Sequence, residues 1–176
     1  MIRKVAPGWD DFSTPLTRDK QGQSQKPDYD FTNLGLLFPQ NDPSEKIYLV
    51  LQMSHGKKPN TPLRFHVHYI QDSAIYPIFK LDYKFYNNGS LVPGSWTTVS
   101  TADNSKGVFP WSSGSILQIG TFPEISLTSD ESVSANIDIK FYRDDNDVAG
   151  DVLAKYVDFH FLKDTVGSNS EFNKYA

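Results

Sequence analysis

The side chains in this sequence best placed to do chemistry are His66 and His68, two histidines separated by one residue. In an extended strand, residues two apart point to the same face, so both imidazoles can reach one ion. His160 lies in another stretch of alternating residues. Imidazole nitrogen is a common zinc ligand. His66, His68 and His160 are therefore our candidates for a polar or metal-like cluster.

The H-x-H spacing resembles the first metal motif of cupins, which are β-sandwich metalloenzymes. The carboxylate that this motif requires a few residues later is missing, because Ile, Gln, Asp and Ser follow Tyr69. No later glycine-proline segment carries a further histidine. We therefore expect no bound metal and no other cofactor. We expect His66 and His68 on the polar or interface-facing side of their strand, paired with Asp or Tyr across the sheet.

The acidic segment from Asp144 to Asp151 is a candidate calcium loop. Its carboxylates are hard oxygen donors of the kind that calcium prefers, and they belong to Asp144, Asp145, Asp147 and Asp151. However, Gly150 is not spaced as in an EF-hand, and a solvated turn between two strands has the same composition. Both interpretations stay open.

Other catalytic patterns find little support. Ser113 lacks the G-x-S-x-G elbow of serine hydrolases. Glycine loops that bind phosphate are missing, and no pair of carboxylates stands out for glycoside cleavage, a reaction that depends on their separation in space. We assign no catalytic residue and expect a protein that is not an enzyme.

The elements that would position these residues are β-strands. Apolar and polar residues alternate in residues 63–70, 79–85, 133–141 and 157–161, which is typical of half-buried antiparallel strands. Less regular strands are expected at 47–53, 96–101 and 116–125. We expect the core to include Val133, Ile137, Ile139, Phe141, Val157, Phe159 and Phe161.

The strand pattern predicts an all-β fold made of two packed antiparallel sheets. Clusters of Asn, Gly, Ser, Pro and Asp separate the strands, and no stretch has a helical period. A jelly-roll-like β-sandwich is favoured over an immunoglobulin-like one, because the Cys and Trp spacing of the latter is absent.

Residues 1–45 differ in composition from the rest. Five prolines recur there among polar residues, so we expect an extended N-terminal arm, followed by the sandwich domain at residues 46–176. Either the arm packs on its own domain or neighbouring subunits hold it, and single aromatic residues would be its anchors: Trp9, Phe12, Tyr29 and Phe31.

Charge and composition exclude several partners. The formal net charge is -4 and the basic residues are scattered, so we expect no nucleic acid. No run of 18 apolar residues is present, and the first residues turn polar too early for a signal peptide, so we expect no membrane and synthesis in the cytoplasm. The chain has no cysteine, which excludes disulfides and thiolate metal sites.

Several motifs between residues 48 and 171 together form a family resemblance. Gln52-x-x-His55 is followed by His66-Val67-His68, and Arg143-Asp144-x-Asn146-Asp147 is followed by Gly150-Asp151 and Asp158-x-His160. This combination resembles small structural proteins of tailed bacteriophages with a jelly-roll fold. Tyr69 stands where that pattern has a tryptophan.

The resemblance implies a virion protein that decorates the capsid or associates with the head, assembled as a homotrimer on the major capsid protein. Three alternatives remain. A tail- or fibre-associated virion protein would have the same fold. A carbohydrate-binding module would use exposed rings, for which Trp96, Trp111 and Tyr76 are candidates. A cupin-like metalloenzyme would hold a metal on His66 and His68.

Overall fold

The computed structural model describes residues 9–15, 27–127, 134–144 and 149–163, with the backbone alone for residues 9–15. These residues form ten β-strands and one 3₁₀ turn, η1 (Thr101–Asp103). No helix in these ranges is long and apolar enough to cross a membrane.

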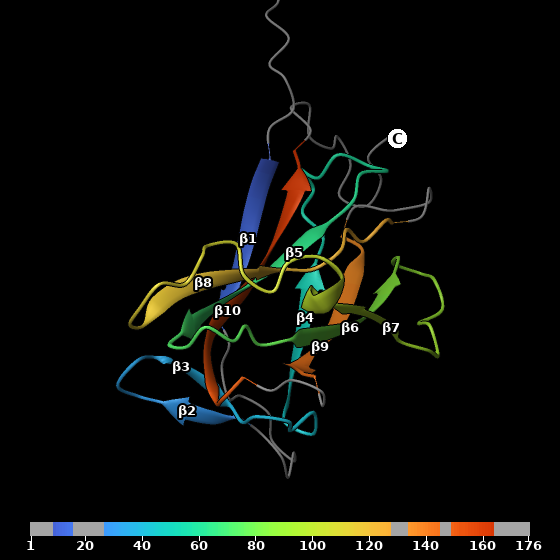
Figure 1. The fold of residues 1–176 in the computed structure, drawn as a ribbon. Helices are drawn as coiled ribbons and strands as arrows, with labels where there is room; N and C mark the ends of the chain where they lie inside the picture. Colours follow the sequence, from blue (N-terminus) through green and yellow to red (C-terminus); the bar gives the residue numbers. More distant parts are fainter. Residues whose placement is uncertain (1–8, 16–26, 128–133, 145–148, 164–176) are drawn as a thin grey trace, which may run out of the picture.

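The strands form two antiparallel sheets that pack face to face (Figure 1). The larger sheet has the order β2-β3-β10-β5-β8, and β1 also pairs with β10. The smaller sheet has the order β4-β9-β6-β7. The strands are β1 (Trp9–Pro15), β2 (Asp28–Asp30), β3 (Gly35–Phe38), β4 (Lys46–Gln52), β5 (Arg64–Gln71), β6 (Phe79–Tyr86), β7 (Thr97–Ser100), β8 (Ile116–Thr121), β9 (Asn136–Arg143) and β10 (Val152–Leu162).

The connectivity is that of a jelly roll. When β3 to β10 are renumbered from 1 to 8, the two sheets read 1-8-3-6 and 2-7-4-5. This is the order produced when a long antiparallel hairpin rolls up into two four-stranded sheets. The predicted fold class, a two-sheet antiparallel sandwich of jelly-roll type, is confirmed.

Aromatic side chains from both sheets fill the space between them. Phe38 of β3 contacts Phe141 of β9 edge to face, with ring centroids 5.4 Å apart. Phe141 in turn stacks on Phe79 of β6 at 5.1 Å. All three rings are fully buried. Such aromatic pairs stabilise the core beyond the free energy of burying their apolar area.

The predicted core residues are buried where the structure describes them. Ile137, Ile139 and Phe141 of β9 face the core, as do Val157, Phe159 and Phe161 of β10. Val133 lies outside the described residues. The alternation therefore gave the correct face for both strands.

The structure differs from the expected boundary between an arm and a sandwich at residue 45. β1 pairs with residues 156–162 of β10, and β3 pairs with residues 152–154 on the same edge. Leu36 and Phe38 of β3 are fully buried in the core. These short strands gain their stability from pairing with β10, so they need no long alternating pattern of their own. Described parts of residues 1–45 thus belong to the sandwich.

The four aromatic residues expected to anchor the arm have different places. Trp9 and Phe12 belong to β1, where their side chains lie outside the description. Tyr29 of β2 is half-buried and packs against the core, whereas Phe31 is 83% exposed. An assembly role for these residues stays a prediction.

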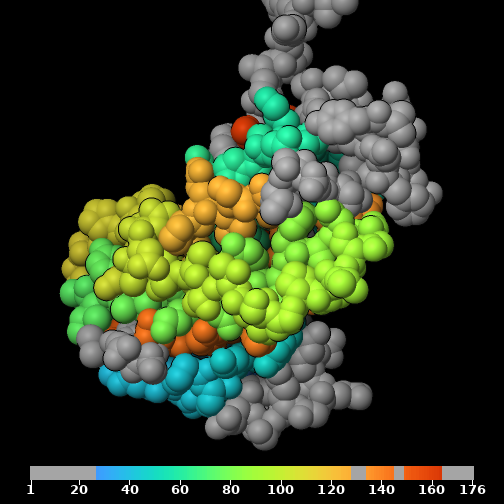
Figure 2. Space-filling view, turned by 90° about the vertical axis from the view of Figure 1, so that its right-hand side faces the viewer, coloured from blue at the N-terminus to red at the C-terminus, as the bar shows by residue number. Residues whose placement is uncertain are grey.

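The outer edge of β8 is covered by the segment that follows η1. Val108 donates its backbone N–H to the carbonyl of Ile119, and Ser105 forms a bridge with Thr121. The buried side chain of Gln118 accepts a hydrogen bond from the Phe109 N–H and donates one to the Phe109 carbonyl. This segment and the β6–β7 connection, coloured light green to yellow, form much of the face seen in Figure 2.

Candidate functional site

The candidate site lies on the face of the larger sheet that points away from the core. In β5, Phe65, Val67 and Tyr69 are buried in the core, so the residues between them face outward. In β10, Val157 and Phe159 face inward in the same way. The two strands are neighbours, and their register pairs Asp158 with His66 and Tyr156 with His68. The alternation on each strand and this register together create the cluster.

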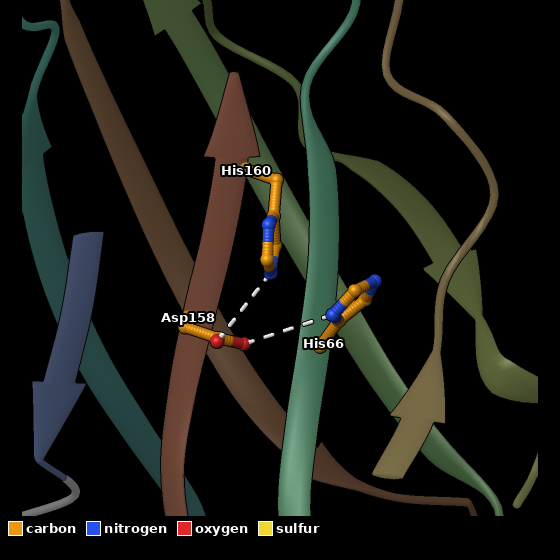
Figure 3. Close-up of side chains that lie close together, drawn as sticks. All are labelled: His66, Asp158 and His160. Atoms are coloured by element: carbon orange, nitrogen blue, oxygen red, sulfur yellow. Dashed lines mark ion pairs between the residues drawn. The ribbon is translucent and has the colours of Figure 1, made fainter. Parts of the chain in front are cut away.

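Three imidazoles lie around the Asp158 carboxylate. Nδ1 of His66 is 4.0 Å from Oδ1, and Nε2 of His160 is 3.6 Å from Oδ2. Nε2 of His68 is 3.4 Å from Oδ2. Figure 3 shows His66 reaching from β5, and Asp158 and His160 from β10, with the side chains converging on one point. We call these four residues the His-Asp cluster.

The rings also contact one another. The centroids of His66 and His160 are 4.5 Å apart, and His68 stacks on Tyr156 at 4.3 Å. The expected pairing of His66 and His68 with Asp or Tyr across the sheet is therefore found, with Asp158 and Tyr156 as the partners.

Several polar atoms of the cluster are buried without a hydrogen bond. The Asp158 side chain is 8% exposed, and its Oδ1 has no hydrogen-bond partner among the described residues. Neither ring nitrogen of His68 has one among these residues, although Nε2 lies 3.4 Å from Oδ2 of Asp158. Leaving such groups unsatisfied typically costs about 1–3 kcal/mol each. These unsatisfied groups therefore lower the stability of the fold unless another group binds to them.

The cluster changes the acidity of two of its members. Burial and the neighbouring His160 lower the pKa of His66, and the Asp158 carboxylate, which acts in the opposite direction, does not offset them. Burial raises the pKa of Asp158, but the contact with His68 and the positive charge available on the three histidines outweigh it and leave that pKa below its ordinary value. Near neutral pH, this favours an ionised carboxylate beside a neutral His66 imidazole.

The sequence predicted three members of this cluster and missed the fourth. His66, His68 and His160 come together as expected, whereas His55 is elsewhere, with Nε2 2.7 Å from the hydroxyl of Ser134. Asp158 was not assigned to the site, although it has the same spacing from His160 that His66 has from His68. A search for polar residues two apart on both strands would have found it.

A cleft of about 540 Å³ opens beside His66. His66 lines it, together with Arg64, Thr121 and Glu124. Arg64 donates from Nε to Glu124 at 2.6 Å, so its charge is engaged across the cleft wall. The cleft gives solvent a route to the His66 side of the cluster.

The two described carboxylates of the acidic segment each have a partner elsewhere in the fold. Asp144 is buried and lies 3.1 Å from the ammonium of Lys80, and Asp151 accepts a hydrogen bond from the backbone of Gln40. Asp145 and Asp147 lie outside the described residues. Both described carboxylates thus join the ends of neighbouring strands, and the candidate calcium loop stays a prediction.

The candidate rings for sugar stacking lie in two places. The hydroxyl of Tyr76 accepts a hydrogen bond from the backbone N–H of Trp111, so these two residues are neighbours. Trp96 lies elsewhere, with the ammonium groups of Lys84 and Lys140 over its ring. The three rings therefore form no common platform.

Comparisons with known proteins give one structural likeness. No family model matches the chain, and no curated protein matches its sequence. The crystal structure of the infectious bursal disease virus VP2 subviral particle is similar with a TM-score of 0.35 and 11% identity. The match covers 96% of this chain and 38% of the VP2 chain.

Proposed function

We propose that the chain is a non-enzymatic structural protein of a virus particle. Within that role, we propose a capsid decoration or auxiliary head protein of a tailed bacteriophage, which assembles with itself as a trimer and docks on the major capsid protein. The observation that carries the proposal is a jelly roll whose interior is filled by its own side chains.

Because the interior is filled, binding contacts with other molecules fall to the outer surface of the domain. Phe65, Val67 and Tyr69 occupy the inner face of β5, where a sandwich that encloses a substrate would need space. Jelly rolls serve viral capsids, lectins and cupins alike, so the fold alone does not select among them. The packed interior favours the uses in which the outer surface makes the contacts.

Residues of the motifs that resemble the phage proteins stabilise the fold of this chain. Arg143 is fully buried and donates to the carbonyls of Phe38, Ala149 and Gly150. Tyr69, at the position of the tryptophan, donates its hydroxyl to the carbonyl of Lys106 and holds the segment beside β8. A motif set that stabilises a scaffold suits a protein selected for its shape and surface.

Labelling of intact particles tests the proposal. Antibodies against the purified protein, detected by immunogold electron microscopy, should decorate the heads of particles of the virus that encodes the chain. Label on tails or fibres would support the tail-associated alternative instead. Particles without label, together with a purified protein that is strictly monomeric and does not sediment with empty capsids, would refute a virion role.

A glycan array separates the carbohydrate-binding alternative. A structural protein should bind no glycan above background. Specific binding that is lost in Trp111→Ala but kept in Trp96→Ala would favour the module, since Trp111 lies beside Tyr76 and Trp96 does not.

A further inference from the structure

We propose that His66, Asp158 and His160 form a binding site for a divalent transition-metal ion, with zinc as the best match. This inference stands on the geometry of the cluster alone and does not depend on the proposed virion role. It differs from the expectation of a metal-free fold, which rested on the incomplete cupin motif around His66 and His68.

The three residues offer a converging set of ligand atoms. One donor atom from each residue can be chosen so that all lie within 4.8 Å of one another. Ligands about 2.1 Å from a tetrahedral ion lie roughly 3.4 Å apart. Nδ1 of His66 lies 4.0 Å from Oδ1 of Asp158, and Nε2 of His160 lies 3.6 Å from Oδ2, so rotations of these side chains can bring one donor atom of each to the spacing of a metal site.

Two buried strands hold this set in place. Asp158 and His160 are two residues apart on β10 and share its outer face, while His66 is the direct cross-strand partner of Asp158 on β5. The inner faces of both strands are fixed in the core by Phe65, Val157 and Phe159. Ligands on packed strands lose little conformational freedom when they bind an ion.

A bound ion would provide a partner for a buried carboxylate oxygen of the cluster. The buried Oδ1 of Asp158 lacks a hydrogen-bond donor among the described residues. When the surrounding imidazoles are neutral, a dication supplies positive charge to this buried carboxylate. The His66 and His160 side chains are partly exposed, which leaves an entry path and a coordination position for water.

The donor set selects the class of metal. Two imidazole nitrogens and one carboxylate oxygen suit zinc and other first-row transition ions, whereas calcium and magnesium prefer oxygen ligands throughout. The chain has no cysteine, so no thiolate competes for the ion.

Equilibrium dialysis of the full chain against zinc, with metal analysis, tests the proposal. After removal of bound metal with a chelator, the wild type should take up one zinc per chain with a Kd below about 10 µM. His66→Gln, His160→Gln and Asp158→Asn should each weaken binding by more than the roughly 10- to 100-fold typical of residues outside the ligand set. His55→Gln is the matched control and should bind zinc as the wild type does.

A second measurement protects the test against variants that fail to fold. Circular dichroism should show the same β-sheet content in all metal-free variants. Zinc should raise the Tm of the wild type and of His55→Gln, and leave the Tm of Asp158→Asn unchanged. Cobalt in place of zinc should give the intense visible absorption of a four-coordinate ion in the wild type.

The proposal is overturned if the wild type takes up no zinc at about 100 µM, ten times the expected Kd. It is equally overturned if His55→Gln loses as much zinc as His66→Gln, since binding would then be a property of surface histidines in general. Calcium uptake in place of zinc would also contradict it, because the donor set would then be wrong.

Discussion

Replacing the buried Arg143 should destabilise the fold more than any surface arginine can. Arg143 ends β9, and its side chain is 0% exposed. Nη1 donates to the carbonyls of Phe38 and Gly150 at 3.1 and 2.7 Å, and Nη2 donates to Ala149 at 2.9 Å. One guanidinium thus joins the end of β3 to the segment between β9 and β10.

Arg143→Met keeps much of the side-chain volume and removes all three hydrogen bonds. Hydrogen bonds to charged groups contribute about 1.5–3 kcal/mol each, but burying the guanidinium itself has a cost, so the three do not add. We expect a loss of about 3–5 kcal/mol in the free energy of unfolding, because three carbonyls lose a buried donor and each unsatisfied buried polar group costs about 1–3 kcal/mol. The measurement is urea denaturation followed by circular dichroism and by tryptophan fluorescence.

Arg64→Met is the matched control for this experiment. Arg64 is about half exposed and pairs with the exposed Glu124, so its replacement should cost at most about 1 kcal/mol. If the two variants lose similar stability, or if Arg143→Met loses less than about 1 kcal/mol, the three carbonyl contacts do not hold the strands together as argued.

Three other changes test the core, the N-terminal strands and the cluster. Phe141→Ala should cost about 3–5 kcal/mol in urea denaturation, whereas Phe31→Ala, at a ring that is 83% exposed, should cost less than about 1 kcal/mol; similar losses would show the core to be misplaced. Deleting residues 1–26 removes β1 and bares one edge of β10, so it should lower the urea midpoint and promote aggregation in light scattering; a truncated chain as stable as the full one would contradict the pairing. Because the pKa of His66 lies below 6.5 in the fold, the unfolded chain takes up a proton first as the pH falls, and the metal-free protein should lose stability from about pH 6.5 downward. His66→Gln should flatten this part of the curve, and an unchanged curve would remove His66 from the explanation.

The longer strands of the sandwich were predictable because apolar and polar residues alternate along each of them. Apolar and polar residues alternate in 64–69, 79–85 and 136–141, and the apolar positions of each segment pack in or against the core. The short strands β2 and β3 carry no such signal. β3 has only four residues, among them Leu36 and Leu37, one buried and one exposed, and it is a strand because β10 lies beside it. Stability that comes from a partner about 115 residues away leaves no local pattern.

The cluster likewise depends partly on local sequence pattern and partly on which distant strands pair. Side chains of a strand alternate between its two faces, which predicts that His66 and His68 share a face and that Asp158 and His160 share a face. It does not predict that β5 and β10 are neighbours, or that Asp158 lies opposite His66 and not opposite His68. The His-Asp cluster depends on that register, which is set by packing across the whole sheet.

The alternation also decides which kind of site the cluster can be. A shift of β5 by one residue relative to the core would exchange its two faces, placing His66 and His68 between the sheets and Phe65 and Val67 outside. Burial of Phe65 and Val67 fixes the opposite arrangement. The histidines therefore cannot line a cavity inside the sandwich, as an enclosed metalloenzyme would require. A ligand of the cluster must approach from the outer surface of the larger sheet.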